Sequence, residues 1–240
     1  MNDLASILKT ASKKLDSFPV DKQREILDLV EELTEMQNKE QARKEFLPFV
    51  RAMWPGFIHG RHHEIMAEAF ERVARGELKR LIINMPPRHT KSEFASYLFP
   101  AWFLGMYPDK KIIQTAHTAE LSVGFGRKVR NLIQNEDFQN VFPGIELSTD
   151  SKAAGRWNTN KRGDYFAIGV GGAVTGKGAD ILIIDDPHSE QEATMGEYNP
   201  EVYNKVYEWY TSGPRQRLQP GGAIILVMTR WSKRDLTGQI

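Results

Sequence analysis

The sequence predicts an α/β fold, in which helices flank a mainly parallel central sheet and a helical segment precedes it. Two observations carry this prediction. Residues 81–83, 181–184 and 223–228 are short, continuous runs of apolar side chains, which are typical of strands buried on both faces of a parallel sheet. Stretches of helical length separate these runs, and such alternation of strand and helix is typical of α/β folds.

The composition limits the class of protein. At 240 residues, the chain is long enough for one large α/β domain or two small ones. Apolar residues make up 40% and charged residues 26%, as in an ordinary globular protein. Because there is no cysteine, disulfides, thiolate metal sites and cysteine nucleophiles are excluded. No apolar run approaches the length of a membrane-spanning helix and the acidic N-terminus is unlike a signal peptide, so no membrane contact is expected.

Residues 1–45 are expected to form a helical accessory segment, and residues 46–240 the main domain. Helices are predicted at 3–16 and 21–45, the second because Ile26, Val30 and Leu33 recur at helical spacing. We expect this segment to pack against the core or a neighbour rather than to carry a site.

The main domain begins with an aromatic-rich stretch and a helix that opens at His62 and His63 and closes at Gly76. Adjacent residues on a helix point about 100° apart and no H-E-x-x-H spacing follows, so a metal site is disfavoured against packing or contact with a nucleotide base. The other expected elements are a helix from Ser92 that is interrupted or restarted near Pro100, a strand at 111–115, a helix at 119–135, a hairpin at 156–170, a helix at 201–212 and a final helix capped by Ser232 and Asp235.

The stretch from Arg80 to Ser92 predicts a strand, a tight turn and a helix start, which is the order that a phosphate-binding loop needs. Lys91 would reach the β- and γ-phosphates of a nucleotide, and Ser92 would help to hold Mg²⁺. Met85 and Thr90 stand at the glycine positions of the standard G-x-x-x-x-G-K-[ST] pattern, so the loop alone leaves phosphate binding open. The expected nucleotide-binding residues are Pro86, Pro87, Arg88, His89, Thr90, Lys91 and Ser92.

Two adjacent carboxylates, Asp185 and Asp186, follow the apolar run 181–184. The carboxyl ends of strands are where ligands bind in open α/β sheets. Asp185 would hold Mg²⁺ directly or through water, and Asp186 would orient or deprotonate an attacking water. The alternative is an aspartate that only caps the next turn, and the Lys-Ser loop upstream makes that alternative weaker.

Five sequence motifs follow one another along the main domain, and two of them contain the loop and the aspartate pair described above. They are Asn84-Met-Pro-Pro-Arg-His-Thr-Lys-Ser92, Ser122-x-x-Phe125-Gly126-Arg127-x-Val129-Arg130, Thr175-Gly-Lys-Gly-Ala-Asp180, Ile184-Asp-Asp-Pro187 and Met228-Thr-Arg-Trp231…Asp235-Leu236-x-Gly238. In this order they resemble the large terminase subunits of tailed bacteriophages, over about residues 46 to 240. The resemblance implies a P-loop NTPase fold of the additional-strand type.

The resemblance also implies roles for individual residues. Lys91 and Ser92 match the phosphate-binding lysine and the metal-binding hydroxyl of the family's Walker A loop. Arg88 matches an arginine of that loop that senses or stabilises the γ-phosphate. Asp185 matches the Walker B aspartate.

Two more matches concern catalysis and motion. Asp186 matches the catalytic carboxylate, which is Glu in many members, and Thr229 matches the motif that couples hydrolysis to movement. Two departures from the family bear on the turnover rate. Thr90 replaces a glycine, so a β-branched residue must tolerate that backbone conformation, and Asp186 is one methylene shorter than Glu.

The function that the resemblance implies is hydrolysis of ATP with Mg²⁺ to drive double-stranded DNA into a capsid. The implied partners are DNA, the portal protein, the small terminase subunit and further copies of the chain in a ring, expected to be a pentamer on the portal. The implied location is the cytoplasm of the infected bacterial host, with transient docking on the procapsid. The family usually has a C-terminal nuclease domain with no counterpart here, so no DNA cleavage is expected from this chain.

Two other functions stay open from the sequence. One is a helicase-like ATPase that translocates DNA with the same core. The other is a structural or adaptor protein that kept the fold and a degenerate loop but lost activity. Nucleotide binding and hydrolysis by the isolated chain would separate the second alternative from the rest.

Ring ATPases commonly complete each site with a cation from the neighbouring subunit. Lys177 is the first candidate for this role, because Gly176 and Gly178 leave it unhindered and it is close in sequence to the run 181–184. Arg127 and Arg130 are the other candidates. The alternative is that all three are solvated surface groups.

Overall fold

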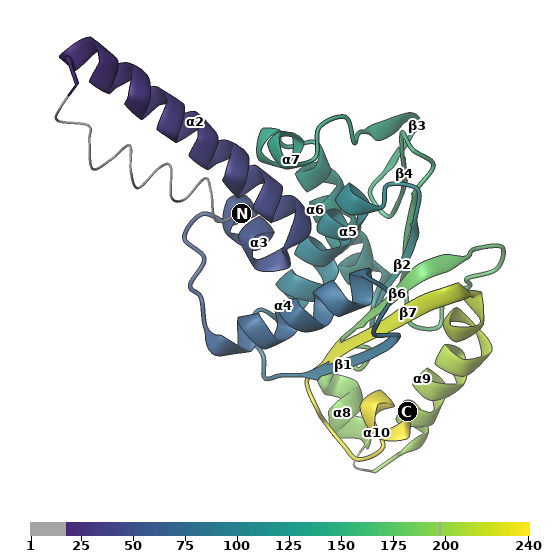
Figure 1. Cartoon of the computed structure of the whole chain (residues 1–240). Coiled ribbons are helices and arrows are strands. Elements are labelled where there is room, and N and C mark those ends of the chain that lie inside the picture. Colours follow the sequence, from purple (N-terminus) through teal and green to yellow (C-terminus); the bar gives the residue numbers. More distant parts are fainter. Residues whose placement is uncertain (1–17, 197) are drawn as a thin grey trace.

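A central sheet with strand β7 between β1 and β6 organises the chain (Figure 1). The computed structural model describes residues 18–196 and 198–240, without the side chains of 150–152, and within this part the sheet has seven strands. In spatial order they are β1 (Arg80–Asn84), β7 (Leu218–Met228), β6 (Ala179–Asp185), β2 (Lys111–Ala116), β5 (Asp164–Gly169), β4 (Arg156–Thr159) and β3 (Leu147–Ala153).

Most of the sheet is parallel. Strands β1, β7, β6, β2 and β5 pair in parallel, whereas β4 pairs antiparallel with both β5 and β3. The carboxyl ends of the five parallel strands therefore meet at one edge of the sheet. The predicted α/β fold with a mainly parallel sheet is confirmed, and so is the hairpin formed by β4 and β5.

Strand β6 shows why the apolar runs predict buried strands. Ile181 and Ile183 belong to the core on one face of the sheet, whereas Leu182 and Ile184 belong to the core on the other face. Side chains along a strand point alternately to the two faces, so a strand covered on both sides must be apolar at every position.

Helices cover both faces (Figure 1). The first face carries α3 (Phe46–Met53), α4 (Arg61–Ala74), the π-helix η2 (Glu93–Leu98), α5 (Phe99–Met106), α6 (Ala119–Ile133) and α7 (Glu136–Val141). Their aromatic side chains dominate the core there: the Phe46 ring alone lies within 6.5 Å of the ring centroids of five neighbouring aromatic residues. The second face carries α9 (Glu201–Ser212), with α8 (Glu190–Gly196), the 3₁₀ helix η3 (Pro214–Arg217) and α10 (Leu236–Gln239) beside it.

The helix after the Lys-Ser pair does not stop at Pro100. It begins as η2, where the Phe99 N–H donates to the Phe94 carbonyl five residues back, and continues as α5. Pro100 is the second residue of α5, directly after the change from π- to α-helical structure. The predicted interruption is therefore a change of helix type.

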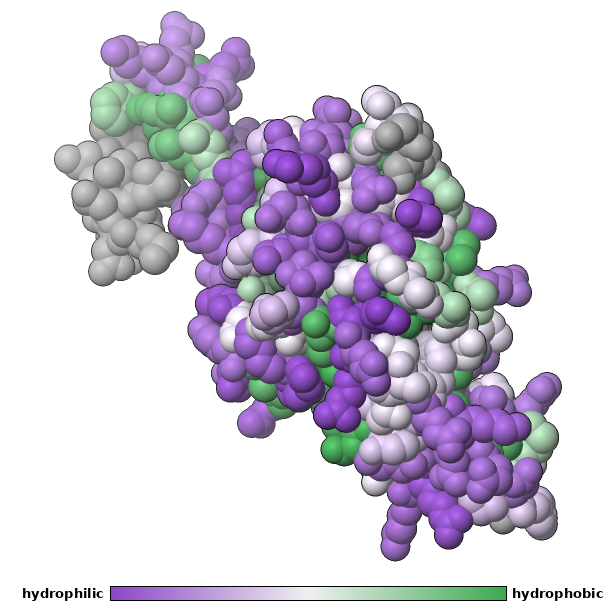
Figure 2. Space-filling view, turned by 90° about the vertical axis from the view of Figure 1, so that its right-hand side faces the viewer, coloured by the Kyte–Doolittle hydropathy of each residue, from purple (hydrophilic) through white to green (hydrophobic). Residues whose placement is uncertain are grey.

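Helix α2 (Val20–Lys44) projects away from the sheet (Figure 1). Within α2 the structure buries only Ala42, and apolar residues such as Leu27, Leu29 and Met36 are more than half exposed. Figure 2 shows apolar residues on the surface of this projecting segment. The helix predicted at 21–45 is confirmed, the one predicted at 3–16 lies outside the described residues, and the domain boundary at 45/46 stays a prediction.

None of the helices that the structure describes is both long and apolar enough to cross a bilayer.

Candidate functional site

The carboxyl ends of β1, β7 and β6 bring the predicted site residues together. Asn84 at the end of β1 pairs with Met228 at the end of β7, and Val227 of β7 pairs with Asp185 at the end of β6. The loop after β1, the two aspartates and Thr229 therefore converge on one edge, although more than 130 residues separate Lys91 from Thr229.

The loop between β1 and η2 has the backbone geometry of an anion-binding nest. Arg88 and Thr90 have positive φ angles of 62° and 63°, whereas the residues that follow each of them do not. Such alternation turns successive N–H groups toward one point. In the described part of the chain, the N–H groups of residues 89–92 have no hydrogen-bond acceptor, and they precede a helix whose N-terminal end favours negative charge.

Thr90 occupies the second glycine position in the left-handed conformation that glycine would adopt. For a residue with a Cβ atom this conformation costs roughly 1–2 kcal/mol. As expected from the sequence, a β-branched residue here adopts unusual backbone angles. The loop therefore holds local backbone strain at Thr90.

Lys91 joins two of the predicted groups. Its side chain is 7% exposed, and its Nζ lies 2.9 Å from Asp186 Oδ2 and donates to Thr229 Oγ1 at 3.3 Å. Asp186 Oδ1 in turn accepts the Thr229 N–H at 2.7 Å. Asp186 has a positive φ of 39°, which turns it out of the strand and toward the lysine.

Asp185 lies deeper, with 2% of its surface exposed. Ser92 Oγ donates to Oδ1 at 2.8 Å and Ser96 Oγ donates to Oδ2 at 2.6 Å, so both carboxylate oxygens accept a hydroxyl. Burial raises the pKa of Asp185 to about 7, against the opposing effect of these two hydroxyl donors.

Ser96 was not predicted from the sequence. It lies one helical turn after Ser92, in the π-helix η2, and its hydroxyl also accepts a hydrogen bond from Gln114 Nε2 of β2 at 3.0 Å. π-Helical turns occur frequently at functional sites. The spacing of four residues between two serines is the signal that could have indicated a shared partner.

The other predicted loop residues are exposed. Arg88 makes no hydrogen bond or ion pair with the residues that the structure describes, and His89 Nδ1 lies 2.9 Å from the Pro87 carbonyl. A pocket of about 290 Å³ opens beside them, lined by Asn84, Met85, Pro86, Pro87, Thr229 and Arg230. A larger cavity of about 420 Å³ lies between α2 and α3, and none of the predicted site residues lines it.

The structure does not bring Lys177 to this cluster. Lys177 precedes β6 and Asp185 ends it, and a strand of seven residues places the two about 20 Å apart. At that opposite edge, Lys177 Nζ lies 2.8 Å from Asp164 Oδ2 and 5.3 Å from the centre of the Phe166 ring. The proposed role of Lys177 on a neighbouring subunit stays a prediction, because that role requires no contact with this chain's own cluster.

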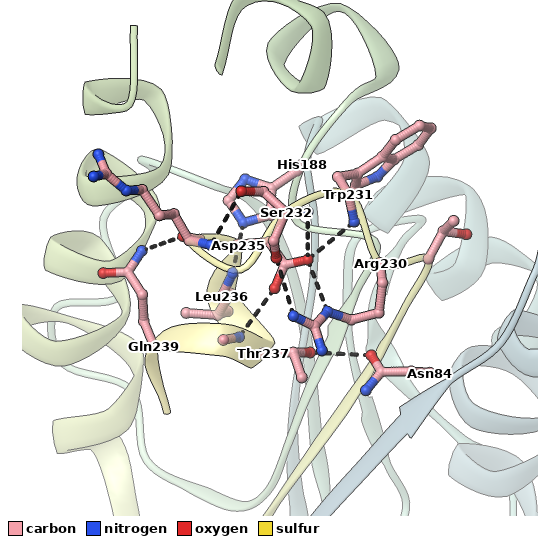
Figure 3. Close-up of polar contacts among 12 residues, drawn as sticks. Asn84, His188, Arg230, Trp231, Ser232, Asp235, Leu236, Thr237 and Gln239 are labelled. Atoms are coloured by element: carbon pink, nitrogen blue, oxygen red, sulfur yellow. Dashed lines mark hydrogen bonds and ion pairs between the residues drawn. The ribbon is translucent and has the colours of Figure 1, made fainter. Parts of the chain in front are cut away.

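The segment after β7 forms a compact polar turn around Asp235 (Figure 3). Asp235 is fully buried, and its Oδ2 accepts from Arg230 Nε at 2.9 Å and from the N–H groups of Trp231 and Ser232 at 3.0 and 3.1 Å. Burial would raise the pKa of Asp235, but these donors outweigh it and the pKa is lowered. The N-cap of α10 is Asp235, whose Oδ1 accepts the Gly238 N–H, so the predicted pair does cap this helix, but the N-cap is Asp235 rather than Ser232.

This turn forms hydrogen bonds to the segment after β6 and to the end of β1 (Figure 3). The Leu236 N–H donates to Nε2 of the buried His188 at 3.0 Å, and Thr237 Oγ1 donates to Asn84 Oδ1 at 3.1 Å. His188 follows the two aspartates by two residues, and Asn84 ends β1. Burial lowers the pKa of His188, which favours the neutral ring that can accept this N–H. Neither His188 nor Asn84 was predicted as part of the site.

Comparison with known proteins gives similarity at the level of structure. No protein-family model matches the sequence, and no curated protein matches it. Among solved structures, the chain is similar to the crystal structure of the HK97 bacteriophage large terminase, with 11% sequence identity and a TM-score of 0.49. The similarity covers 84% of this chain and 39% of that protein, so the chain spans about two fifths of the other's length. The assignment of individual residues rests on the geometry described above.

Proposed function

We propose that the chain is an ATPase of the additional-strand P-loop type and the motor domain of a phage large terminase. One observation carries the proposal: a Lys-Ser pair at the head of a helix meets two carboxylates from the end of a parallel strand. The position of β7 between β1 and β6 supports the additional-strand type, and the five ordered sequence segments support the terminase family.

Binding of ATP would use groups that are already oriented. The N–H groups of residues 89–92 and the ammonium of Lys91 would receive the β- and γ-phosphates. Ser92 and Asp185 offer the oxygen ligands that Mg²⁺ prefers, and this ion usually binds to one or two carboxylates together with phosphate oxygens and water. When bound, Mg²⁺ would neutralise charge on the phosphates.

Hydrolysis would require Lys91 to exchange partners. Its Nζ now pairs with Asp186, and a phosphate in the nest would draw it away. Asp186, still held by the Thr229 N–H, would then be free to take a proton from a water that attacks the γ-phosphorus, which yields ADP and phosphate. Arg88 would stabilise the negative charge that develops on the transferred group.

When Lys91 changes partners, Thr229 would be the first residue to respond, because it forms hydrogen bonds with both Lys91 and Asp186. The turn around Asp235 continues directly from it and contacts Asn84 and His188. A change at the phosphate site would therefore reach residues 230–238.

The remaining parts of the proposal follow from the sequence resemblance. They are movement of double-stranded DNA into a capsid, contact with a portal protein and a small terminase subunit, assembly into a ring that would be a pentamer on the portal, and action in the cytoplasm of an infected host.

The first test is ATP hydrolysis by the purified chain with Mg²⁺, wild type against Lys91→Ala. Wild type should release phosphate, and the variant should lose hydrolysis and most affinity for ATP, since the loop has no second ammonium. Equal turnover in both proteins would show that the loop is not the site. If wild type binds and hydrolyses no nucleotide, the chain is a structural or adaptor protein.

A further inference from the structure

A buried histidine of α4 touches the nucleotide loop at its most strained residue. His63 is 3% exposed and packs between aromatic rings, with centroid distances of 4.7 Å to Phe57 and 4.9 Å to Phe94. Its Nε2 lies 2.8 Å from Thr90 Oγ1. The rest of the site is built from segments that follow β1, β6 and β7, whereas His63 reaches it from a helix that precedes β1.

The hydrogen bonds around His63 allow one assignment of its proton. The Gly60 N–H donates to Nδ1 at 2.9 Å, so Nδ1 is an acceptor and carries no hydrogen. Burial lowers the pKa of His63 to about 4, so the ring is neutral near pH 7 and its single proton lies on Nε2. Nε2–H therefore donates to Thr90 Oγ1, and the Thr90 hydroxyl donates onward to the His89 carbonyl at 2.6 Å.

These two hydrogen bonds fix the side chain of Thr90, whose backbone conformation shapes the loop. Thr90 has a φ of 63°, which is unusual for a β-branched side chain. With one hydrogen bond accepted from His63 and one donated to His89, its side chain has a single compatible orientation. A glycine at this position would adopt the conformation without strain but would offer no hydroxyl to hold.

We propose that His63 is a positioning residue of the nucleotide loop, whose Nε2–H holds Thr90 in the left-handed conformation and so keeps the N–H groups of residues 89–92 directed at the phosphates. The inference rests on the proposed ATPase function. In the standard phosphate-binding loop a glycine at this position adopts the left-handed conformation without strain. In this chain, Thr90 adopts it because the hydrogen bond from His63 stabilises it.

Two substitutions of His63 separate its two hydrogen bonds. In His63→Gln the amide nitrogen stands where Nε2 was, so the donor to Thr90 is kept and the acceptor for Gly60 is lost. In His63→Asn the amide oxygen stands near Nδ1, so the Gly60 bond is kept and the donor to Thr90 is lost. The Kd of Mg-ADP should rise about tenfold in His63→Asn, the factor that one hydrogen bond is worth, and stay near wild type in His63→Gln.

The decisive measurement is a double-mutant cycle with Thr90→Gly. Without the threonine hydroxyl there is nothing for Nε2–H to hold, so His63→Asn should leave the Kd of Mg-ADP unchanged in the Thr90→Gly background. An equal loss of affinity in both backgrounds, or no loss in wild type, would overturn the inference.

The thermal unfolding midpoints of the same variants give a readout that needs no nucleotide. The shifts caused by His63→Asn and Thr90→Gly should be non-additive, since both remove the same bond, whereas additive shifts would contradict the contact. If His63→Asn does not fold, Thr90→Val alone is compared with wild type, because valine keeps the shape and loses the hydroxyl, and the Kd of Mg-ADP should then rise about tenfold. If wild type binds no nucleotide but the midpoints are non-additive, the proposed function fails and the loop-holding contact stands.

Discussion

Asp185 and Asp186 are neighbours in the chain but have different surroundings. Asp185 is the last residue of β6, faces the helices of the first core and is held by two hydroxyls. Asp186 leaves the strand with a positive φ, keeps a third of its side chain exposed and pairs with Lys91. Two carboxylates whose environments differ in this way are suited to different roles, one for metal binding and one for proton transfer.

Replacing Asp186 with asparagine tests the second role. The amide keeps the shape and the contact with the Thr229 N–H but has no basic oxygen, so Asp186→Asn should spare nucleotide binding. Turnover should fall by about 10²–10⁴, the usual loss when one positioned general base is removed. Both quantities come from kcat under saturating ATP and from the Kd of a non-hydrolysable analogue. A variant with full kcat would point to another base, such as Glu190.

Burial of Asp185 predicts a dependence of stability on pH in the absence of nucleotide. Its pKa is raised to about 7 in the folded state, against about 3.9 in an unfolded chain. Between these values the folded protein binds a proton that the unfolded protein lacks, so this group's contribution to the free energy of unfolding falls as pH rises. Asparagine at position 185 cannot ionise and has no such dependence.

The measurement is thermal unfolding of wild type and Asp185→Asn at pH 5 and pH 8 without Mg²⁺. The unfolding midpoint of the variant, relative to wild type, should be higher at pH 8 than at pH 5. A difference in midpoint that is the same at both pH values would show that Asp185 does not titrate in this range.

At the scale of elements, the strands were predictable where burial on both faces imposes an unbroken apolar run, as in β6. Strand β3 and helix α8 were not, because β3 is a largely polar edge strand paired only with β4, and no described residue of α8 is buried. The proximity of Lys91 and Asp186 was also predictable, because the carboxyl ends of parallel strands meet at one edge of the sheet. Contacts such as His63–Thr90 and Ser96–Asp185 span 27 and 89 residues without a known motif, so only tertiary packing brings them together.

The π-helix η2 makes a testable contribution through Ser96. Its hydroxyl lowers the pKa of Asp185, in opposition to burial, and occupies one carboxylate oxygen. In Ser96→Ala the pKa of Asp185 should rise further, so a larger share of the carboxyl is protonated near neutral pH. Mg²⁺-dependent ATP binding should therefore weaken, and more at pH 6 than at pH 8.

Isothermal titration at the two pH values measures this effect. Ser212→Ala is the matched control, because the Ser212 hydroxyl donates to the Glu208 carbonyl on the exposed side of α9, far from Asp185. If Ser96→Ala weakened binding equally at pH 6 and pH 8, its hydroxyl would act on the fold of η2 rather than on the ionisation of Asp185.

At the scale of the whole molecule, the two ends of the parallel strands differ. Among the described non-glycine residues with positive φ, Arg88, Thr90 and Asp186 lie together at the carboxyl edge, whereas Arg162 lies in the turn before β5 at the amino edge. The amino edge carries the ion pairs of Lys110 with Asp180 and of Lys177 with Asp164. Several strained residues that meet in one cluster are typical of a functional site, whereas a single one in a hairpin turn is not.

This difference gives a matched comparison of two lysines. Lys91 and Lys177 are 7% and 15% exposed, and their Nζ atoms lie 2.9 and 2.8 Å from a carboxylate, but they sit at opposite edges of the sheet. Methionine has a similar length and no charge. Lys91→Met should abolish hydrolysis. Lys177→Met should keep it within about twofold while the unfolding free energy falls by about 1–3 kcal/mol, because Asp164 is left partly buried without its partner.

Mixing the two variants decides whether Lys177 instead acts on a neighbouring subunit. If it completes the neighbour's site, Lys177→Met alone should be inactive and folded, and activity should return when it is mixed with Lys91→Met, because each supplies what the other lacks. If Lys177 only pairs with Asp164, Lys177→Met is active by itself, and adding Lys91→Met does not raise the turnover of Lys177→Met.

Specific activity measured across a range of protein concentrations completes the test. A site finished by a neighbour gains activity faster than linearly as chains assemble, whereas a site complete in one chain has constant activity per chain. The ion pair with Asp164 at the far edge of the sheet leads us to expect that Lys177→Met keeps its activity.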